Sequence, residues 1–440
     1  MKPLPAPSSP APVVNERSTA NDGVSVTECS AVYRGASVDG EPLTVLQQAA
    51  AERQAAGLGR SLTPRAAGWD GPLDLASNDY LGLASDARLA TAAADASRDW
   101  GPGSTGSRLV TGTTTLHTRL ERELAAFAGA ARALVFSSGY LANLAVVTAL
   151  AQVLTSGHER DGVLIVSDAA NHASLIDACR LARAQGAQGA QRVRVTVTPH
   201  ADVAAVERAL SRRAERFALV VTDTVFSVAG DLAPVRDLHQ VARAHGALLV
   251  LDEAHAFGVL GPGGRGAAAA AGIAGDPHVI RTFTLSKSLG GQGGAVAGAA
   301  EVIATLIDVG RAFIFDTGLA PPSTAAALAA VAILRGEPDL GRRAQANARR
   351  LAELATGLGF DAGEPAAAVV RLLLGEPAAA VEAQRICAEH GVRVGCFRPP
   401  SVPPGQACLR LTARANLSEV HLALAFRALG AVRDHVRITA

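Results

Sequence analysis

The chain has 440 residues, 49% of them hydrophobic, and a formal net charge of +1, which is enough apolar material for one large core or two moderate ones. Near-neutral charge without a basic run argues against nucleic acid as a partner, and the longest apolar run, residues 323–336, is too short to span a membrane. Five cysteines without CxxC spacing argue against a disulfide framework and against a metal site, so we expect a cytoplasmic protein.

Residues 1–40 are rich in Pro, Ser and Ala without periodicity, which predicts a flexible tail without a secretory signal. A helix is expected from Pro42 to about Gly59. Beyond it, apolar runs alternate with helical stretches, which indicates an α/β fold with a mostly parallel sheet covered on both faces. The strand-like runs begin at Ala133, Val163, Arg192, Ala218, Ala247 and Val279. A smaller α+β domain is expected after about residue 330, with strands that begin at Ala368, Val392 and Cys408.

Lysine is nearly absent from this sequence. Lys2 and Lys287 are the only two lysines among 41 Lys and Arg residues. A GC-rich coding bias explains the arginines, but it leaves the one internal lysine informative, because arginine cannot offer the free amine that a Schiff base requires. Lys287 lies in a stretch rich in Ser and Gly, TLSKSLGGQGG.

The quartet Asp252–His255 spells the DEAH box of helicase ATPases. An ATPase also needs a phosphate loop of the form GxxxxGK[ST]. The positions that this loop requires before Lys287 hold Ser286 and Arg281 and no glycine, which argues against an ATPase. A carboxylate and an imidazole three residues apart remain, and they fit either a site or an ordinary strand-ending turn.

The residues Ser138-Gly139-Tyr140 follow an apolar strand and open a helical run. Backbone N–H groups and the helix dipole favour an anion there, although a plain turn and helix cap fits as well. His172 could likewise simply begin a helix. In chain order, however, the helix start, His172, Ser227, the strand-end aspartate with its histidine, and Lys287 supply the functions that a pyridoxal 5′-phosphate (PLP) site needs.

Eight stretches resemble, in the same order, the motifs of the α-oxoamine synthases. They are LASNDYLGL, GSRLVTGTTTLHTRLERELAAF, SSGYLAN, NHASLIDACR, VFSVAGDLAPV, VLDEAH, TLSKSLGGQGG and FRPPSVPPGQACLRLT. The resemblance covers about residues 42–433 and implies fold type I of the PLP-dependent transferases, with a mostly parallel seven-stranded sheet flanked by helices. It implies a PLP cofactor and a homodimer with active sites at the interface. The implied parts are a tail at 1–40, a segment at 41–100 packing with the small domain, a large PLP-binding domain at 101–330 and a small α+β domain at 331–440.

The resemblance also implies a role for each matching residue around the cofactor. Lys287 would form the Schiff base and act as the general base, and Asp252 would keep the pyridine nitrogen protonated. His172 would stack on the ring and take part in catalysis and substrate binding. Implied phosphate contacts are Ser138, Gly139, Tyr140, Thr284 and, from the neighbouring subunit, Thr317. Implied contacts of the 3-hydroxyl are Ser227 and His255.

For the substrates, the resemblance implies that Asn78 and Arg410 contact the amino acid, with Arg410 on its carboxylate. Arg398, and more weakly Arg60 and Ser401, would lie near the acyl substrate, although a plain surface role stays open for Arg60 and Ser401. Members of the family condense an amino acid with an acyl thioester and release carbon dioxide. The stretch FRPPSVPPG resembles the branch that joins L-alanine to a pimeloyl thioester in biotin biosynthesis.

Two positions depart from the family pattern. Ala256 stands where glycine is usual and Ser401 where threonine is more common, and both changes predict local tuning of the pocket and acyl entrance. Three alternatives remain: an α-oxoamine synthase that uses glycine and acetyl-CoA, an aminotransferase of the same fold, and a non-catalytic subunit, against which the retention of Lys287 argues. The acyl carrier, coenzyme A or a carrier protein, is left open.

Overall fold

The computed structural model describes residues 41–68, 71–156, 162–187 and 192–436. The chain divides into two units, Met1–Leu62 and Thr63–Ala440. The tail predicted at residues 1–40 lies outside the described residues. In the first unit the predicted helix is confirmed as α2 (Pro42–Ala55), which begins at a proline because the missing N–H costs nothing in the first turn.

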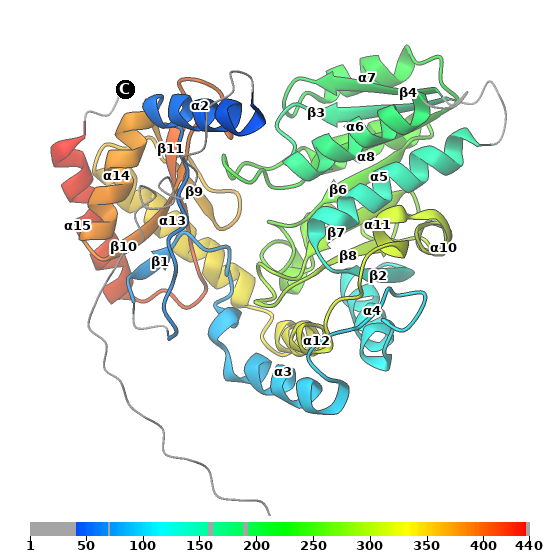
Figure 1. Ribbon diagram of the computed structural model, residues 1–440, viewed down its shortest axis with the longest axis horizontal. Coiled ribbons are helices and arrows are strands. Elements are labelled where there is room, and N and C mark those ends of the chain that lie inside the picture. Colours follow the sequence, from blue (N-terminus) through cyan, green and yellow to red (C-terminus); the bar gives the residue numbers. More distant parts are fainter. Residues whose placement is uncertain (1–40, 69–70, 157–161, 188–191, 437–440) are drawn as a thin grey trace, which may run out of the picture. The chain divides into compact units, whose positions relative to one another are not determined.

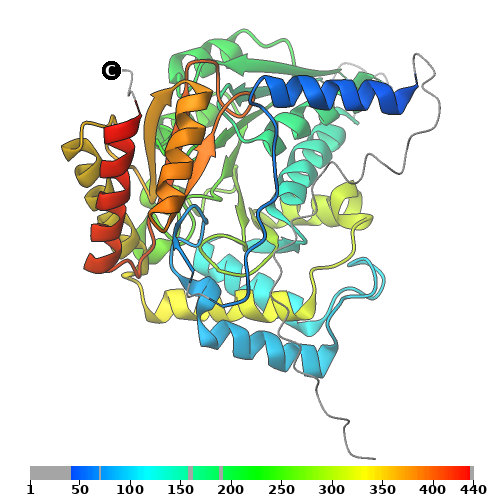
Figure 2. The ribbon, with the colours of Figure 1, turned by 60° about the vertical axis from the view of Figure 1, so that its left-hand side comes forward.

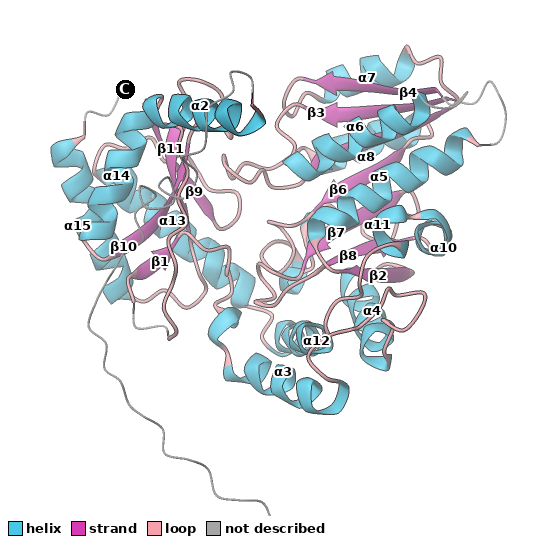
Figure 3. Cartoon of the chain, viewed as in Figure 1, coloured by secondary structure: helices cyan, strands magenta, loops and turns pink. Residues whose placement is uncertain are grey.

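The second unit contains a seven-stranded sheet in the order β2-β8-β7-β6-β5-β3-β4. Its strands are β2 (Arg132–Phe136), β3 (Gly162–Asp168), β4 (Arg192–Thr198), β5 (Phe217–Asp223), β6 (Leu248–Asp252), β7 (Val279–Thr284) and β8 (Gly294–Gly298). Neighbours pair in parallel except at β8, which runs antiparallel to β7 and β2 (Figures 1 and 3). The predicted mostly parallel seven-stranded sheet is therefore confirmed.

Helices cover both faces of this sheet, and alternate residues of each strand enter different cores. In β3, Leu164 and Val166 belong to one apolar cluster, and Val163 and Ile165 belong to another. The first cluster draws on α3 (Ala87–Trp100), α4 (Thr115–Ala128), α7 (Val203–Ser211), α8 (Val235–Ala244), α9 (Ala267–Ala270) and α12 (Pro321–Gly336). The second draws on α5 (Gly139–Thr155), α6 (Ala173–Ala187), α10 (Ala300–Val309) and α11 (Arg311–Ile314). Burial on both faces explains why the strands read as continuous apolar runs.

A smaller sheet follows the order β1-β10-β11-β9. Its strands are β1 (Leu73–Leu75), β9 (Val369–Gly375), β10 (Val392–Phe397) and β11 (Ala407–Thr412). β1 pairs in parallel with β10, with Leu73 opposite Val392, and the other pairs are antiparallel. A third apolar cluster joins the sheet to α13 (Leu340–Gly357), α14 (Pro377–Glu389) and α15 (Glu419–His435). Two short 3-10 helices, η1 (Leu83–Ser85) and η2 (Pro262–Gly264), complete the elements of this unit.

Two strands differ from the prediction. The sequence did not indicate β1, which has only three residues, or β8, whose sequence GAVAG has one branched residue, Val296, among glycines and alanines. The apolar run near residue 330 is confirmed as a helix, α12, which lies beside α3 (Figures 1 and 2). Within the described part of the chain, no helix combines the length and apolar character that crossing a membrane requires.

Candidate active site

A pocket of about 210 Å³ lies at the carboxyl ends of the central strands of the large sheet, the edge where open α/β sheets bind ligands. Asp223, Asp252 and Thr284 are the last residues of β5, β6 and β7. The lining residues are Ser138, Gly139, Tyr140, Asn143, His172, Ser174, Asp223, Val225, Asp252, Ala254, His255, Phe283, Thr284, Ser286 and Lys287. The pocket thus holds every predicted cofactor residue except Ser227 and Thr317.

Lys287 presents its amine to the pocket next to His255, with Nζ 2.7 Å from Nε2. Burial, helped by the positive charge of Arg410, lowers the pKa of Lys287 to about 8, although the negative charges of Asp252 and Asp223 oppose the shift. An amine with such a pKa changes its protonation near neutral pH. It can therefore act as a nucleophile and as a general base, which an ordinary surface lysine does poorly.

A line of hydrogen bonds connects Lys287 to the smaller sheet. The Nδ1 atom of His255 contacts the hydroxyl of Tyr80, and this hydroxyl donates to Oδ1 of Asn78 at 3.1 Å. The guanidinium of Arg410, on β11, donates to the same oxygen of Asn78. Burial lowers the pKa of His255 well below its usual value and raises the pKa of Tyr80 to about 12, so both groups are neutral at physiological pH.

Asp252 is held by two donors. Nδ2 of Asn143 donates to Oδ2 at 2.7 Å, and the backbone N–H of Ala254 donates to Oδ1 at 2.9 Å. Asn143 is fixed in turn, because its own Oδ1 accepts a hydrogen bond from Thr282 at 2.6 Å. Donors of this kind favour an ionised carboxylate, which can pair with a protonated ring nitrogen.

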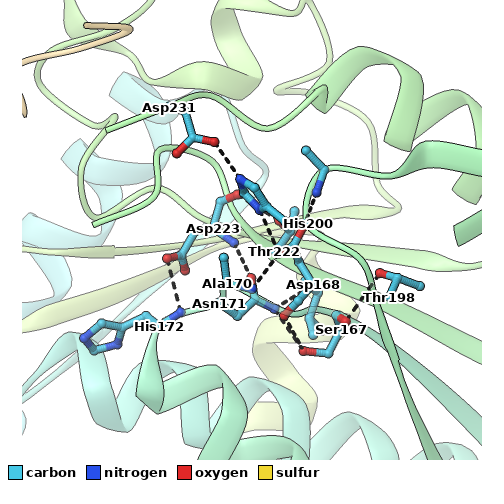
Figure 4. Close-up of polar contacts among 12 residues, drawn as sticks. Ser167, Asp168, Ala170, Asn171, His172, Thr198, His200, Thr222, Asp223 and Asp231 are labelled. Atoms are coloured by element: carbon cyan, nitrogen blue, oxygen red, sulfur yellow. Dashed lines mark hydrogen bonds and ion pairs between the residues drawn. The ribbon is translucent and has the colours of Figure 1, made fainter. Parts of the chain in front are cut away.

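His172 lies at the start of α6, beside the end of β5. Its Nδ1 atom is 2.7 Å from the hydroxyl of Ser174, and its backbone N–H donates to Oδ2 of Asp223 at 3.2 Å (Figure 4). Burial lowers the pKa of His172, and the negative charge of Asp252 opposes that shift. A neutral imidazole ring therefore faces the pocket from this side.

The start of α5 has the geometry of an anion site. Ser138 is the N-cap, and its hydroxyl accepts from the N–H of Leu141 at 3.2 Å. A β-carbon on Gly294 would lie 2.4 Å from the backbone of Ser138 and Gly139, so only glycine lets β8 approach the helix start this closely. The Thr284 hydroxyl lies beside it, 2.6 Å from the hydroxyl of Ser286. Backbone N–H groups and hydroxyls here suit a phosphate.

The pocket has a matching group for each of three parts of PLP: its phosphate, its ring nitrogen and its aldehyde, which needs an amine. The helix start with Thr284 fits the phosphate, Asp252 fits the ring nitrogen, and Lys287 supplies the amine. One further observation points to a ligand: Oδ1 of Asp223 is buried and has no hydrogen-bond partner among the described residues. Among those residues, no cluster of His, Cys, Asp and Glu is arranged to hold a metal ion.

The other predicted residues lie outside the lining set. Ser227 is in the turn after β5, and Thr317 pairs with Ser107 and lines a separate narrow pocket. Asn78 and Arg410 reach the site through Tyr80, as described above. Arg398 and Ser401, two of the predicted contacts of the acyl substrate, lie beyond the end of β10. The third, Arg60, belongs to the first unit and is not placed relative to the pocket.

Sequence reasoning missed several residues of the site. Tyr80 and Asn143 stand inside motifs that were recognised, LASNDYLGL and SSGYLAN, but nothing local shows that they reach His255 and Asp252. Asp223 was detectable, because it is the polar residue at the end of the apolar run ALVVTD, the same signal that drew attention to Asp252.

A second polar cluster lies next to the site, at the ends of β3 and β4. His200 stands between two carboxylates, with Nδ1 3.0 Å from Asp168 and Nε2 2.6 Å from Asp231, and its ring meets Phe226 edge-on (Figure 4). Burial tends to lower the pKa of His200, but the hydrogen bonds to Asp168 and Asp231 outweigh it and raise the pKa above its usual value. The imidazole of His200 thus links the loop after β4 to the turn after β5.

Replacing His200 by glutamine should destabilise the protein more at pH 6 than at pH 8.5. A histidine whose pKa is raised by folding stabilises fully below its unfolded pKa, about 6.5, and the contribution is lost as the pH rises through the folded value. Because the side chain is 38% exposed, we expect only about 0.5 kcal/mol. Urea unfolding at both pH values measures it. His390→Gln, which loses only a contact to the carbonyl of Ile386, is the control, and equal losses for His200→Gln at both pH values would contradict the prediction.

A sheet covered on both faces, with a strand-end pocket built around a buried lysine, defines an α/β enzyme of the aminotransferase-like class. Comparison with known proteins narrows the class. Residues 70–429 match the family described as aminotransferase class I and II. The chain belongs to this family, which confirms the resemblance drawn from its motifs.

Several known proteins are similar to this chain over most of its length. An 8-amino-7-oxononanoate synthase from Mycobacterium sp. (strain KMS) is 54% identical over 396 residues, which cover 90% of this chain and 98% of the relative. A serine palmitoyltransferase variant from S. paucimobilis, solved with bound PLP-myriocin, has a TM-score of 0.79 and 26% identity, and covers 89% of this chain and 98% of its own. An 8-amino-7-oxononanoate synthase from Francisella tularensis has a TM-score of 0.67 and 27% identity, and covers 82% of this chain and 98% of its own.

Proposed function

We propose that this protein is a PLP-dependent 8-amino-7-oxononanoate synthase. It condenses L-alanine with a pimeloyl thioester and yields 8-amino-7-oxononanoate, the free thiol and carbon dioxide, in biotin biosynthesis. The observation that carries the proposal is the neutralisable amine of Lys287, placed 2.7 Å from His255 in the strand-end pocket. The 54% identity to the mycobacterial synthase supports the choice of substrates.

Three groups of residues would hold the cofactor. The start of α5 and Thr284 bind its phosphate, Asp252 pairs with the ring nitrogen, and Lys287 forms the covalent link. When bound, PLP supplies an electron sink that stabilises negative charge at the α-carbon of the amino acid. His172 and His255, both neutral, lie on the walls of the pocket and contribute hydrogen bonds and contact area without adding charge.

Lys287 is also the residue that moves the proton. Its amine, once free, is positioned to remove a proton from the α-carbon and later to return one, because its pKa of about 8 lies close to the working pH. The pair Asn78 and Arg410 holds the substrate carboxylate. Arg410 is buried and stacks over Phe397 at 5.3 Å, and its fork of donors has capacity beyond the single bond to Asn78.

The test is to incubate the PLP-loaded protein with L-alanine and pimeloyl-CoA and to follow free thiol and carbon dioxide. We expect both to appear in equal amounts and only when alanine is present. Glycine with acetyl-CoA, run in parallel, distinguishes a glycine C-acetyltransferase. Release of neither product from any pair would leave the non-catalytic subunit as the better reading, and amino transfer without carbon dioxide would favour an aminotransferase.

We further propose that the protein works as a homodimer in the cytoplasm. Thr317 lies outside the pocket, in a strand-like contact with Ser107, and two strongly exposed apolar residues flank this contact: Val110 is 79% exposed and Phe315 is 71% exposed. Apolar residues exposed together often mark an interface. In a dimer they would be covered, and Thr317 would serve the pocket of the second copy.

Phe315→Arg should therefore weaken the dimer and lower activity, although Phe315 is not among the residues that line its own pocket. Sedimentation measures the mass in solution, where wild type should have the mass of two chains. Val420→Arg, at a 75% exposed residue of α15, is the matched control and should leave both mass and activity unchanged. A wild-type protein with the mass of one chain would contradict the proposal.

A further inference from the structure

Two carboxyl groups lie side by side at the carboxyl ends of β5 and β6. Asp223 and Asp252 are direct partners in the parallel register of these strands, and both line the pocket. Asp223 is 2% exposed and Asp252 is 6% exposed. Two neighbouring carboxylates in a site with little water cannot both ionise without a large cost in free energy, so one of them keeps its proton.

The hydrogen bonds show which of the two is ionised. Asp252 accepts one bond on each oxygen, from Asn143 at 2.7 Å and from the N–H of Ala254 at 2.9 Å. From the part of the chain that the structure describes, Asp223 accepts only the long bond from the N–H of His172, at 3.2 Å, on Oδ2. Its Oδ1 has no partner among the described residues. Donors stabilise a negative charge, so the charge belongs on Asp252 and the proton on Asp223.

The surrounding charges lead to the same assignment. Burial raises the pKa of Asp223 well above its usual value, and the negative charge of Asp252 raises it further. The N–H of His172 and the charge of Lys287 oppose this, and Asp168 adds to it. The raised pKa favours the protonated form of Asp223.

The backbone around Asp223 is fixed, which gives its side chain a defined direction. Its N–H donates to Oδ1 of Asn171 at 2.9 Å, and Nδ2 of Asn171 donates to the carbonyl of Val221 at 2.9 Å. Figure 4 shows the carboxyl group of Asp223 on the side of His172, away from the cluster around His200. Asp223 is thus presented to the pocket by a rigid strand end, as functional groups on sheets usually are.

We propose that Asp223 is a neutral hydrogen-bond donor and that it donates from Oδ1 to the 3-oxygen of the bound cofactor, beside His255. The proposal rests on the PLP part of the proposed function. A protonated carboxyl group needs an acceptor; the ring nitrogen next to Asp252 is itself a donor when protonated, and the phosphate lies at the start of α5. Among the polar groups of the cofactor, the 3-oxygen is the acceptor that remains.

This assignment adds a residue to those that the motifs implied. The resemblance implied Ser227 as a partner of the 3-hydroxyl, but Ser227 does not line the pocket, whereas Asp223, four residues earlier, does. A neutral donor suits the place, because the negative charge of Asp252 already matches one positive ring nitrogen. A second carboxylate would leave the site with an excess of negative charge.

Two substitutions separate a neutral donor from a carboxylate. Asp223→Asn cannot ionise but keeps a donor of the same size, and Asp223→Ala removes the donor. Titration of the cofactor-free full-length protein with PLP gives the dissociation constant. We expect it to stay within about threefold for Asp223→Asn and to rise about tenfold or more for Asp223→Ala, the usual effect of losing a buried hydrogen bond to a charged group. Asp168→Asn, at the end of the neighbouring β3 but outside this pocket, should stay within about twofold.

Two spectroscopic readouts complete the test. The infrared spectrum of wild type at pH 7 should contain the carbonyl band of a buried protonated carboxyl group, absent from Asp223→Asn. The visible band of the bound cofactor should titrate at higher pH in Asp223→Ala, because a 3-oxygen without its donor holds a proton more tightly. The proposal is overturned if Asp223→Asn behaves like Asp223→Ala, if the infrared band is missing, or if Asp168→Asn loses as much affinity. Neither substrate is used, so a wild type that passes these tests but releases no carbon dioxide from alanine refutes the synthase assignment alone.

Discussion

Lys287→Arg is expected to abolish condensation while leaving the fold unchanged. Arginine keeps the positive charge and nearly the length of lysine, but it stays protonated and cannot form the covalent link or accept a proton. Loss of the general base alone costs about 10²–10⁴-fold in rate, and loss of the covalent link adds to this. Thiol release measures the rate, and borohydride reduction followed by mass spectrometry shows whether PLP is attached to the chain.

The chain provides its own control for this exchange. Lys2→Arg makes the same substitution at the only other lysine and should leave the rate unchanged. Unfolding curves of both variants separate lost chemistry from lost structure. If Lys287→Arg retained a condensation rate within tenfold of wild type, the assignment of Lys287 as base and covalent anchor would be wrong.

Glu253→Gln is expected to cause a large loss of stability. Glu253 and Arg281 are both 0% exposed and form two bonds, Nη2 to Oε2 at 2.8 Å and Nε to Oε1 at 3.1 Å. The same carboxylate accepts from the N–H of Ala268 at 2.8 Å. Removing one member of a buried pair leaves an uncompensated charge, which typically costs about 3–5 kcal/mol in the free energy of unfolding. Urea unfolding measures the loss.

An exposed ion pair gives the comparison. Glu123 pairs with Arg335, and these side chains are 25% and 43% exposed. Glu123→Gln should cost much less than Glu253→Gln, since exposed pairs gain little over water. Similar losses for Glu253→Gln and Glu123→Gln would show that burial does not set the strength of the inner pair.

The strands of the large sheet were largely predictable because their signal is local. A run such as VLIVSD is apolar throughout because β3 is buried on both faces, and this needs no knowledge of distant residues. The strand β8 was not predictable in this way. Its first residue must be small because Gly294 meets the backbone of Ser138 at the start of α5, and this partner is more than 150 residues away along the chain.

The residues of the site were also predictable only where the signal is local. Motif order predicted that Lys287, Asp252, His255 and His172 share one pocket, and the structure places them in one. Asn143 and Tyr80 were not predicted, because their role depends on the distant atoms that they contact, Oδ2 of Asp252 and Nδ1 of His255. The expected contact of Ser227 with the 3-hydroxyl of the cofactor stays a prediction; Ser227 lies in the turn after Val225 and is not among the residues that line the pocket.

The pairing of β1 with β10 has a consequence for the synthesis of the protein. Leu73–Leu75 can pair only with Val392–Val394, which the ribosome makes much later. At roughly 5–20 residues per second, the interval between the two strands is about 15–60 seconds. The large sheet, whose strands all lie between Arg132 and Gly298, can form during that time. The smaller sheet is therefore completed last. A chain whose synthesis ended before β10 would contain β1 without its partner strand.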